Sequence, residues 1–156
     1  MAYGVVAALD VMVPMRDGVR LAFDVYRPGV DGAFADGRFP TIMCHTSYDK
    51  TTKRYTEIAD WFVPRGYNVV LVDMRDRYRS EGSGVYYHAA TPHTGRDGYD
   101  ICEWIAAQPW SNGRIGTVGS SHAGQVLSRW GGTRIRSSRG KSCTSTPTIR
   151  HVSSCR

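Results

Sequence analysis

Residues 114–124 read Arg-Ile-Gly-Thr-Val-Gly-Ser-Ser-His-Ala-Gly, and this stretch decides the fold that the rest of the sequence supports. Its first half is a short apolar run with β-branched residues, which favours a strand and which Gly119 ends. Ser121 follows two residues later with small residues just beyond it, and residues 125–127 have helical apolar spacing. A strand that turns sharply into a helix with serine at the apex is typical of a nucleophile elbow.

The spacing suits nucleophilic chemistry because a serine on a strained turn needs small neighbours. The same turn directs backbone N–H groups toward the oxyanion that forms when serine attacks a carbonyl. Of the two adjacent serines, only Ser121 has glycine two positions before it, so Ser121 is the predicted nucleophile. The motif alone also fits an ordinary strand-to-helix turn, since glycine is abundant in the sequence, and its context must decide.

The charge of the chain is concentrated in one segment. The 156 residues carry a net charge of +6 and 41% hydrophobic residues, which fits one globular domain of modest size. Residues 129–156 hold seven basic residues and no acidic residue, so residues 1–128 are close to neutral. We therefore predict a folded portion over residues 1–128 and a basic Ser/Arg-rich tail over residues 129–156 that is disordered or encoded out of frame.

The cysteines and the N-terminus predict neither a metal site nor a membrane segment. Cys44 and Cys102 lie in apolar patterns and are predicted to be buried thiols. Cys143, His151 and Cys155 lack a fourth ligand and the usual zinc spacing, so we predict no metal and no cofactor. The N-terminal residues show no signal-peptide or transmembrane pattern, and we predict a cytoplasmic protein without a membrane partner.

The remaining segments predict an α/β fold. An Asp17-Gly18 turn between two apolar-alternating runs, residues 11–15 and 19–26, predicts an antiparallel hairpin. Further strands are predicted at residues 39–44, 69–72 and 115–118, helices at 55–65 and 95–108, and loops at 28–37 and 73–94. The first helix is predicted to end at Gly66. Asp97 and Asp100 are predicted to lie in the first turns of the second helix, where the helix dipole stabilises negative charge.

Alternating strands and helices predict a mainly parallel sheet with helices on its faces. In such sheets functional residues gather at the carboxyl ends of the strands. Three segments follow strand ends here: Tyr48 and Asp49, residues 73–80, and Ser121. The predicted nucleophile therefore lies where this architecture places active sites.

Several collinear blocks resemble one known family. They include Val13-Pro-Met-Arg-Asp-Gly-Val-Arg-Leu21, Ser47-Tyr-Asp-Lys50, Asp73-Met-Arg75 with Ser80-Glu-Gly82, Gln108-Pro-Trp-Ser111 and Gly119-Ser-Ser-His-Ala-Gly124. Together they resemble the N-terminal part of the CocE/NonD hydrolases, the α/β-hydrolase group of cocaine esterases and Xaa-Pro dipeptidyl-peptidases, over residues 9–128. The resemblance implies an α/β-hydrolase fold that is truncated after the nucleophile elbow.

By this resemblance, Ser121 is the acylated nucleophile of a serine hydrolase acting on small-molecule ester, amide or Xaa-Pro peptide bonds. The oxyanion hole is formed by the Tyr48 hydroxyl and the backbone N–H of His122. A phenolic O–H aimed at developing negative charge is physically reasonable, because loss of one such donor typically lowers the rate about 10²–10³-fold. The alternative for Tyr48 is a loop tyrosine that packs over the sheet edge.

The sequence departs from the family pattern at several positions. His122 stands where the family usually has tyrosine, and we interpret its side chain as a pocket or packing residue. Asp76 and Arg79 replace glycines in the loop after the fourth strand, and they strain the loop if those glycines serve positive φ. His45 is a candidate pocket residue, whereas two further histidines are predicted to be solvated in loops, His88 and His93.

The family pattern stops after Ser128. An α/β-hydrolase supplies its acid and its histidine after the serine, yet no carboxylate side chain follows Glu103 and His151 is the only histidine after His122. We therefore predict a truncated and inactive hydrolase fragment with a frameshift near Arg129. Two alternatives stay open: a binding module whose basic tail contacts polyanions without specific nucleic-acid recognition, and a non-catalytic subunit that another chain completes.

Overall fold

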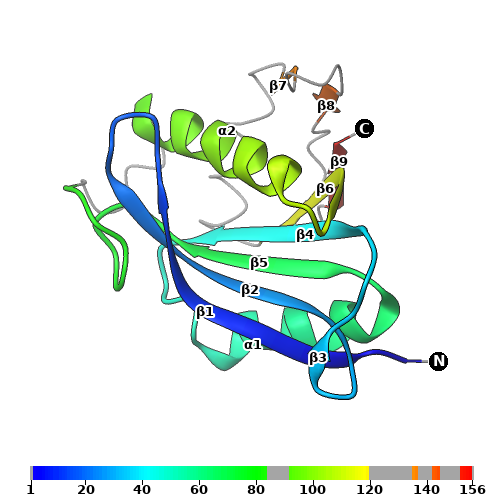
Figure 1. The fold of residues 1–156 in the computed structure, drawn as a ribbon. Coiled ribbons are helices and arrows are strands. Elements are labelled where there is room, and N and C mark those ends of the chain that lie inside the picture. The colour runs from blue at the N-terminus through cyan, green and yellow to red at the C-terminus, as the bar shows by residue number, and fades with distance from the viewer. Residues whose placement is uncertain (1, 84–91, 120–134, 137–141, 145–151, 156) are drawn as a thin grey trace.

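The computed structural model describes residues 2–83, 92–119, 135–136, 142–144 and 152–155, whose strands form one mixed sheet (Figure 1). In spatial order these are β1 (Gly4–Pro14), β2 (Arg20–Val30), β5 (Asn68–Asp73), β4 (Phe39–Thr46), β6 (Ser111–Val118), β9 (Val152–Cys155), β8 (Ser142–Thr144) and β7 (Ile135–Arg136), and β3 (Ala33–Phe34) pairs with β2. The helices are α1 (Lys53–Phe62), followed directly by the 3₁₀ turn η1 (Val63–Arg65), and α2 (Pro92–Ala107).

The centre of the sheet is parallel. β4 pairs in parallel with β5 on one side and with β6 on the other, whereas β1, β2 and β9 add antiparallel pairs. All six residues of β5 are buried, as expected for a strand covered on both faces. The predicted parallel strands with an N-terminal antiparallel hairpin are confirmed, and the sheet as a whole is mixed because β2 pairs antiparallel with β5 and because β9, β8 and β7 add further antiparallel pairs beyond β6.

The N-terminal hairpin turns where the sequence predicts it. Gly18 lies at φ +87°, which suits glycine, and its N–H donates to the carbonyl of Met15 at 2.9 Å. The predicted loop over residues 28–37 is wrong, because β2 continues to Val30 and turns into β3. Asp31 and Gly32 form this second tight turn at φ +51° and +79°, and an Asp-Gly pair favours such a hairpin turn.

Two hydrophobic cores fill the opposite faces of the sheet, beneath the helices that Figure 1 shows on its two sides. Alternate residues of β5 divide between them: Val69 and Leu71 belong to the α1 core, and Val70 and Val72 to the α2 core. The α1 core contains Ile42, Cys44, Tyr55, Ala59, Val63, Val69 and Leu71. The α2 core contains Val13, Met15, Leu21, Phe23, Val25, Met43, Val70, Val72, Ile101, Cys102, Ile105 and Ile115.

The helix boundaries follow local chemistry. The segment formed by α1 and η1 ends at Gly66 in the left-handed conformation, as predicted. The second helix begins at Pro92 rather than at the predicted Gly95, because proline is favoured in the first turn of a helix. Cys44 and Cys102 are buried as predicted, and burial raises the pKa of each thiol to about 12.

The C-terminal part of the chain is described only in part. The helix predicted over residues 125–127 lies outside the described residues. Within the tail, β9 pairs antiparallel with β6, β8 pairs with β9, and β7 pairs with β8. The division of the chain at residue 128 stays a prediction. In the described part of the chain, the helices are all too short or too polar to span a bilayer.

Candidate active site

The carboxyl ends of three parallel strands meet at one edge of the sheet. Thr46 at the end of β4 lies beside Asp73 at the end of β5, and Met43 lies beside Thr117 near the end of β6. The N–H of Met74, the residue after β5, donates to the carbonyl of Thr46 at 2.8 Å, so the hydrogen bonding between the two chain segments continues beyond the end of β5. The segments that follow these strands therefore start from the same edge, as the sequence predicts.

Two of the three predicted catalytic residues, Ser121 and His122, lie outside the described residues. The structure describes the strand that leads to them: β6 ends at Val118, and Gly119 follows it. The predicted nucleophile and the predicted N–H donor therefore stay predictions.

Tyr48, the predicted hydroxyl donor, follows β4 in a tight turn. It is half-buried, and its N–H donates to the Thr46 hydroxyl at 3.0 Å. The ring packs against the α1 core, and so does Val118, three residues before Ser121. Asp49 lies at φ +66°, and its carboxylate accepts the N–H of Thr51 at 2.9 Å, so the turn is held locally.

Lys50, two residues after Tyr48, is fully buried. Its ammonium lies 2.6 Å from Asp10 Oδ1, 2.9 Å from Asp24 Oδ1 and 3.9 Å from Asp73 Oδ2. Burial opposes the lysine charge, but the hydrogen bonds to Asp10 and Asp24 and the nearby carboxylate charges outweigh it and raise the pKa of Lys50. This ionic cluster joins the Tyr48 turn to β1, β2 and β5.

The carboxylates of the cluster are held by the backbone as well. The register of β1 and β2 shifts between Ala8 and Val11, and there Asp10 lies at φ +52° with its N–H donating to Asp24 at 2.9 Å. The N–H of Lys50 donates to Asp73 Oδ1 at 2.9 Å. Even so, burial raises the pKa of Asp73 to about 6.

Lys50 and Asp73 lie in the blocks that resemble the family, but the sequence alone assigns no role to either residue. A signal was available: Asp24 lies inside the apolar run of β2, and Asp73 directly follows the apolar run of β5. A carboxylate that interrupts a buried strand needs a buried partner. Lysine is rarely buried, so the sequence alone does not point to Lys50 as that partner.

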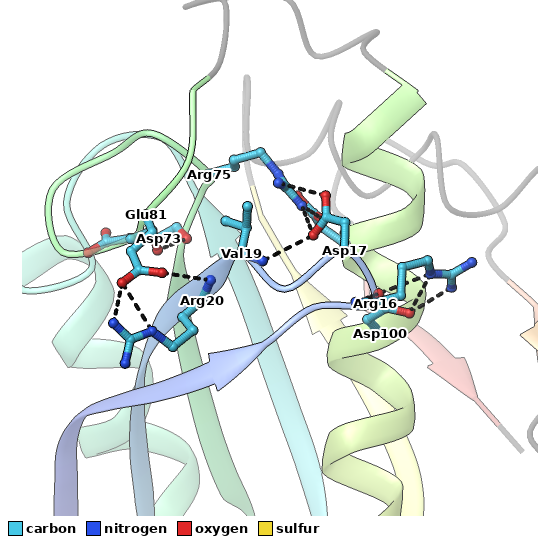
Figure 2. Close-up of polar contacts among 10 residues, drawn as sticks. Arg16, Asp17, Val19, Arg20, Asp73, Arg75, Glu81 and Asp100 are labelled. Carbon is cyan, nitrogen blue, oxygen red and sulfur yellow. Dashed lines mark hydrogen bonds and ion pairs between the residues drawn. The ribbon is translucent and has the colours of Figure 1, made fainter.

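Arg75 connects the loop after β5 to two other elements. Its guanidinium contacts Asp97 of α2 at 2.6 and 3.0 Å and Asp17 of the hairpin turn at 2.9 Å. These contacts raise the pKa of Arg75, with the Asp97 hydrogen bond as the main cause. Figure 2 shows the Asp17 contact with two flanking pairs, Arg16–Asp100 and Arg20–Glu81.

These pairs correct the role predicted for Asp97 and Asp100. The helix starts earlier than predicted, so neither residue lies in its first turn. Each carboxylate binds an arginine instead: Asp97 binds Arg75, and Asp100 binds Arg16 at 2.6 Å. The acids therefore attach α2 to the hairpin tip and the loop after β5.

The same loop contains the predicted departures from the glycine pattern. Asp76 lies at φ +61°, as expected for a position that favours glycine, and aspartate is among the residues that tolerate it. The second residue of this kind in the loop is Tyr78 at φ +48°, and Arg79 is not among the described residues with positive φ. The backbone strain that the sequence predicts at Arg79 is therefore found one residue earlier, at Tyr78.

The structure describes two of the four histidines that the sequence offers outside the elbow motif. His45 is buried in β4 with 1% of its surface exposed. His93 is exposed as predicted, but it belongs to α2 rather than to a loop. His88 and His151 lie outside the described residues.

Comparison with known proteins identifies the family. The model of the X-Pro dipeptidyl-peptidase (S15) family matches residues 17–129. The cocaine esterase of Rhodococcus sp. (strain MB1 Bresler) is 40% identical over 129 residues, which cover 79% of this chain and 20% of that protein. The chain thus spans a fifth of the length of this curated relative.

Solved structures agree with this match. A CocE/NonD family hydrolase from Staphylococcus aureus superimposes with a TM-score of 0.69 at 29% identity, over 81% of this chain and 25% of that one. An α-amino acid ester hydrolase superimposes with a TM-score of 0.64 at 29% identity, over 80% of this chain and 22% of that one. The fold, the collinear blocks and the family match together show that this chain belongs to the S15, CocE/NonD family of α/β-hydrolases.

Proposed function

We propose that this chain carries the nucleophile and the oxyanion hole of a serine hydrolase that cleaves ester or amide bonds, Xaa-Pro peptide bonds included. Ser121 Oγ attacks the carbonyl carbon of a small-molecule or peptide substrate, the ester or amide bond breaks, and the alcohol or amine leaves with the proton given up by the serine, which leaves an acyl-enzyme that water then hydrolyses. The Tyr48 hydroxyl and the His122 N–H donate to the oxyanion that develops.

One observation carries this proposal. Tyr48 follows β4 and Gly119 follows β6 at the same edge of the sheet, and both Tyr48 and Val118 pack against the α1 core. The phenol and the strand that leads to Ser121 are therefore close in the fold although about 70 residues separate them in the sequence. The family match over residues 17–129, which includes the elbow motif, adds support from the sequence.

The proton acceptor is the missing part of the site. The 156 residues contain no carboxylate after Glu103, and His151 is the only histidine after His122. Without an oriented base the hydroxyl of Ser121 is a weak nucleophile at neutral pH. We propose that these residues alone are nearly inactive toward substrates and retain only the catalysis of the oxyanion hole, about 10³–10⁴ over water in a triad enzyme.

A fluorophosphonate probe tests the proposal, because the rate at which it phosphonylates a serine reports how far the site activates that hydroxyl. We expect slow labelling of Ser121, no labelling of the Ser121→Ala variant and normal labelling of the matched Ser120→Ala variant. Tyr48→Phe lowers the labelling rate about 10²–10³-fold if its hydroxyl is an oxyanion donor. Labelling that survives in Ser121→Ala, or that is unchanged in Tyr48→Phe, refutes these assignments.

Imidazole tests the missing base separately. If only the base is absent, added imidazole accepts the proton of Ser121 and speeds labelling in proportion to its concentration. The 1,3-dimethylimidazolium cation, which has no free ring nitrogen and cannot accept a proton, is the control at equal ionic strength. Labelling of a folded chain that imidazole does not accelerate contradicts the idea that the base is the missing part.

A further inference from the structure

Lys50 is a fully buried cation placed two residues from the predicted oxyanion donor. Its side chain is 0% exposed, and its ammonium contacts Asp10 at 2.6 Å and Asp24 at 2.9 Å. The side chain of Asp24 is 3% exposed, whereas that of Asp10 is 45% exposed. A buried ammonium is tolerated only when it is paired, so the geometry of this cluster is strongly constrained.

Lys50 is held at both its backbone and its side chain. Its N–H donates to Asp73 Oδ1 at 2.9 Å, while its ammonium reaches the two carboxylates of β1 and β2. The residue thus attaches the turn after β4 to the strand on one side and to the hairpin beyond it. These contacts restrict both the backbone and the side chain of Lys50, and they therefore restrict the conformation of the turn that it ends.

Tyr48 lies between two fixed points of this turn. On its N-terminal side, Thr46 pairs with Asp73 and accepts the Tyr48 N–H at 3.0 Å. On its C-terminal side, Asp49 adopts φ +66° and leads directly into Lys50. A change at Lys50 therefore reaches the Tyr48 backbone through one intervening residue.

We propose that Lys50 is a positioning residue for catalysis: its ion pairs with Asp10 and Asp24 fix the turn Ser47–Lys50 and so hold the Tyr48 hydroxyl where an oxyanion donor is needed. The catalytic meaning of this inference rests on the proposed function of Tyr48, whereas the positioning itself does not. Lys50 touches no reacting atom and acts only through the tyrosine.

Fluorine NMR tests the positioning without any catalysis. The chain is labelled with 3-fluorotyrosine, and the Tyr48→Phe variant assigns the Tyr48 resonance. We expect Lys50→Met to shift or broaden that resonance and to leave those of distant tyrosines unchanged. Lys53→Met is the matched control, because the Lys53 side chain is 88% exposed and its ammonium lies 3.7 Å from Glu57 one helical turn away. A Tyr48 resonance that stays unchanged in folded Lys50→Met overturns the proposal.

Lys50→Met leaves the carboxylates of Asp10 and Asp24 without their cation, so a second variant is needed in case the first does not fold. The combined Lys50→Gln and Asp24→Asn substitution then serves in its place, because it removes the charges of Lys50 and Asp24 together and keeps polar groups that can pair. The same shift of the Tyr48 resonance is expected, and its absence overturns the proposal equally.

Fluorophosphonate labelling tests the catalytic consequence. Misplacement of a donor by about 1 Å lowers rates on the order of 100-fold, so we expect a loss of this size in Lys50→Met. The double variant with Tyr48→Phe should label no more slowly than Tyr48→Phe alone, because Lys50 acts through Tyr48. Fully additive losses overturn the proposal. If the unmodified chain shows no labelling, the proposed function fails for the isolated chain, and the NMR result still decides the positioning.

Discussion

Arg75→Met is the substitution that most directly tests the ionic contacts around the hairpin tip. The Arg75 side chain is 10% exposed and that of Asp97 is 4% exposed, and two hydrogen bonds of 2.6 and 3.0 Å join them. Methionine keeps much of the side-chain volume but removes the guanidinium. The Asp97 carboxylate is then left buried without its main partner.

The magnitude follows from this burial. Removing one partner of a buried ion pair typically destabilises a protein by about 3–5 kcal/mol. The contact of Arg75 with Asp17 adds little, because the Asp17 side chain is 39% exposed and solvent screens such pairs to about 0–1 kcal/mol. We therefore expect Arg75→Met to lower the free energy of unfolding by about 3 kcal/mol.

Urea unfolding measures this loss. Trp104 on α2 packs edge-to-face against Phe23 of β2, so tryptophan fluorescence reports the docking of the helix. Arg20→Met is the matched control, because the side chains of its pair with Glu81 are 56% and 41% exposed, and we expect a loss of less than about 1 kcal/mol. If Arg75→Met proves no more destabilising than this control, the reasoning from burial is wrong.

A double substitution separates the pair from other effects of Arg75. In the Arg75→Met and Asp97→Asn variant no buried charge is left unpaired, so we expect the loss to be smaller than in Arg75→Met alone. Losses that simply add across the two sites would contradict an ionic interaction between them.

Three further predictions use other described residues. The pKa of Asp73 rises from 3.8 to about 6 on folding, so the folded state binds more protons between these values and stability falls by about 3 kcal/mol as the pH rises through them. Asp73→Asn should remove this component of the slope, as urea titrations at pH 4 to 7 would show. Gly82→Ala should be more destabilising than Gly18→Ala: both glycines have positive φ, but only at Gly82 does an added Cβ come within 2.8 Å of a side-chain carbon of Arg75. The thiol of Cys102, whose pKa burial raises to about 12, should react with a disulfide reagent in the native chain only as fast as the chain opens, and equal rates with and without urea would contradict this.

The parts of the fold that local patterns specify could be predicted from the sequence. The Asp17-Gly18 turn, the apolar run of β5 and the stop at Gly66 each depend on residues close together in the chain, and each is found. The alternation of strands and helices also predicted the edge at which Tyr48 lies. The turn at Asp31-Gly32 has an equally local signal, but the many Gly and Asp residues around it also favour a loop, and the sequence does not decide between the two.

Features that depend on distant pairing could not be predicted in the same way. The carboxylates around Lys50 come from positions 10, 24 and 73, and only the folded sheet brings them together. Asp97 likewise has no pattern that names Arg75 as its partner, so its place near a helix start was interpreted as a dipole effect. Electrostatic partners across a sheet are a property of register and burial rather than of spacing.

The ionic contacts of Lys50 and Arg75 indicate that the N-terminal hairpin does more than cover an edge of the sheet. β5 lies between β4 and β2, so a side chain that follows β4 must extend past the end of β5 to contact the hairpin. Lys50 makes that contact at Asp10 and Asp24, and Arg75 reaches the hairpin turn at Asp17. The loops after β4 and β5 are therefore each fixed to the hairpin by charge. Since those loops start from the edge proposed for catalysis, the hairpin supports the proposed site, and substitutions in it should affect the Tyr48 turn.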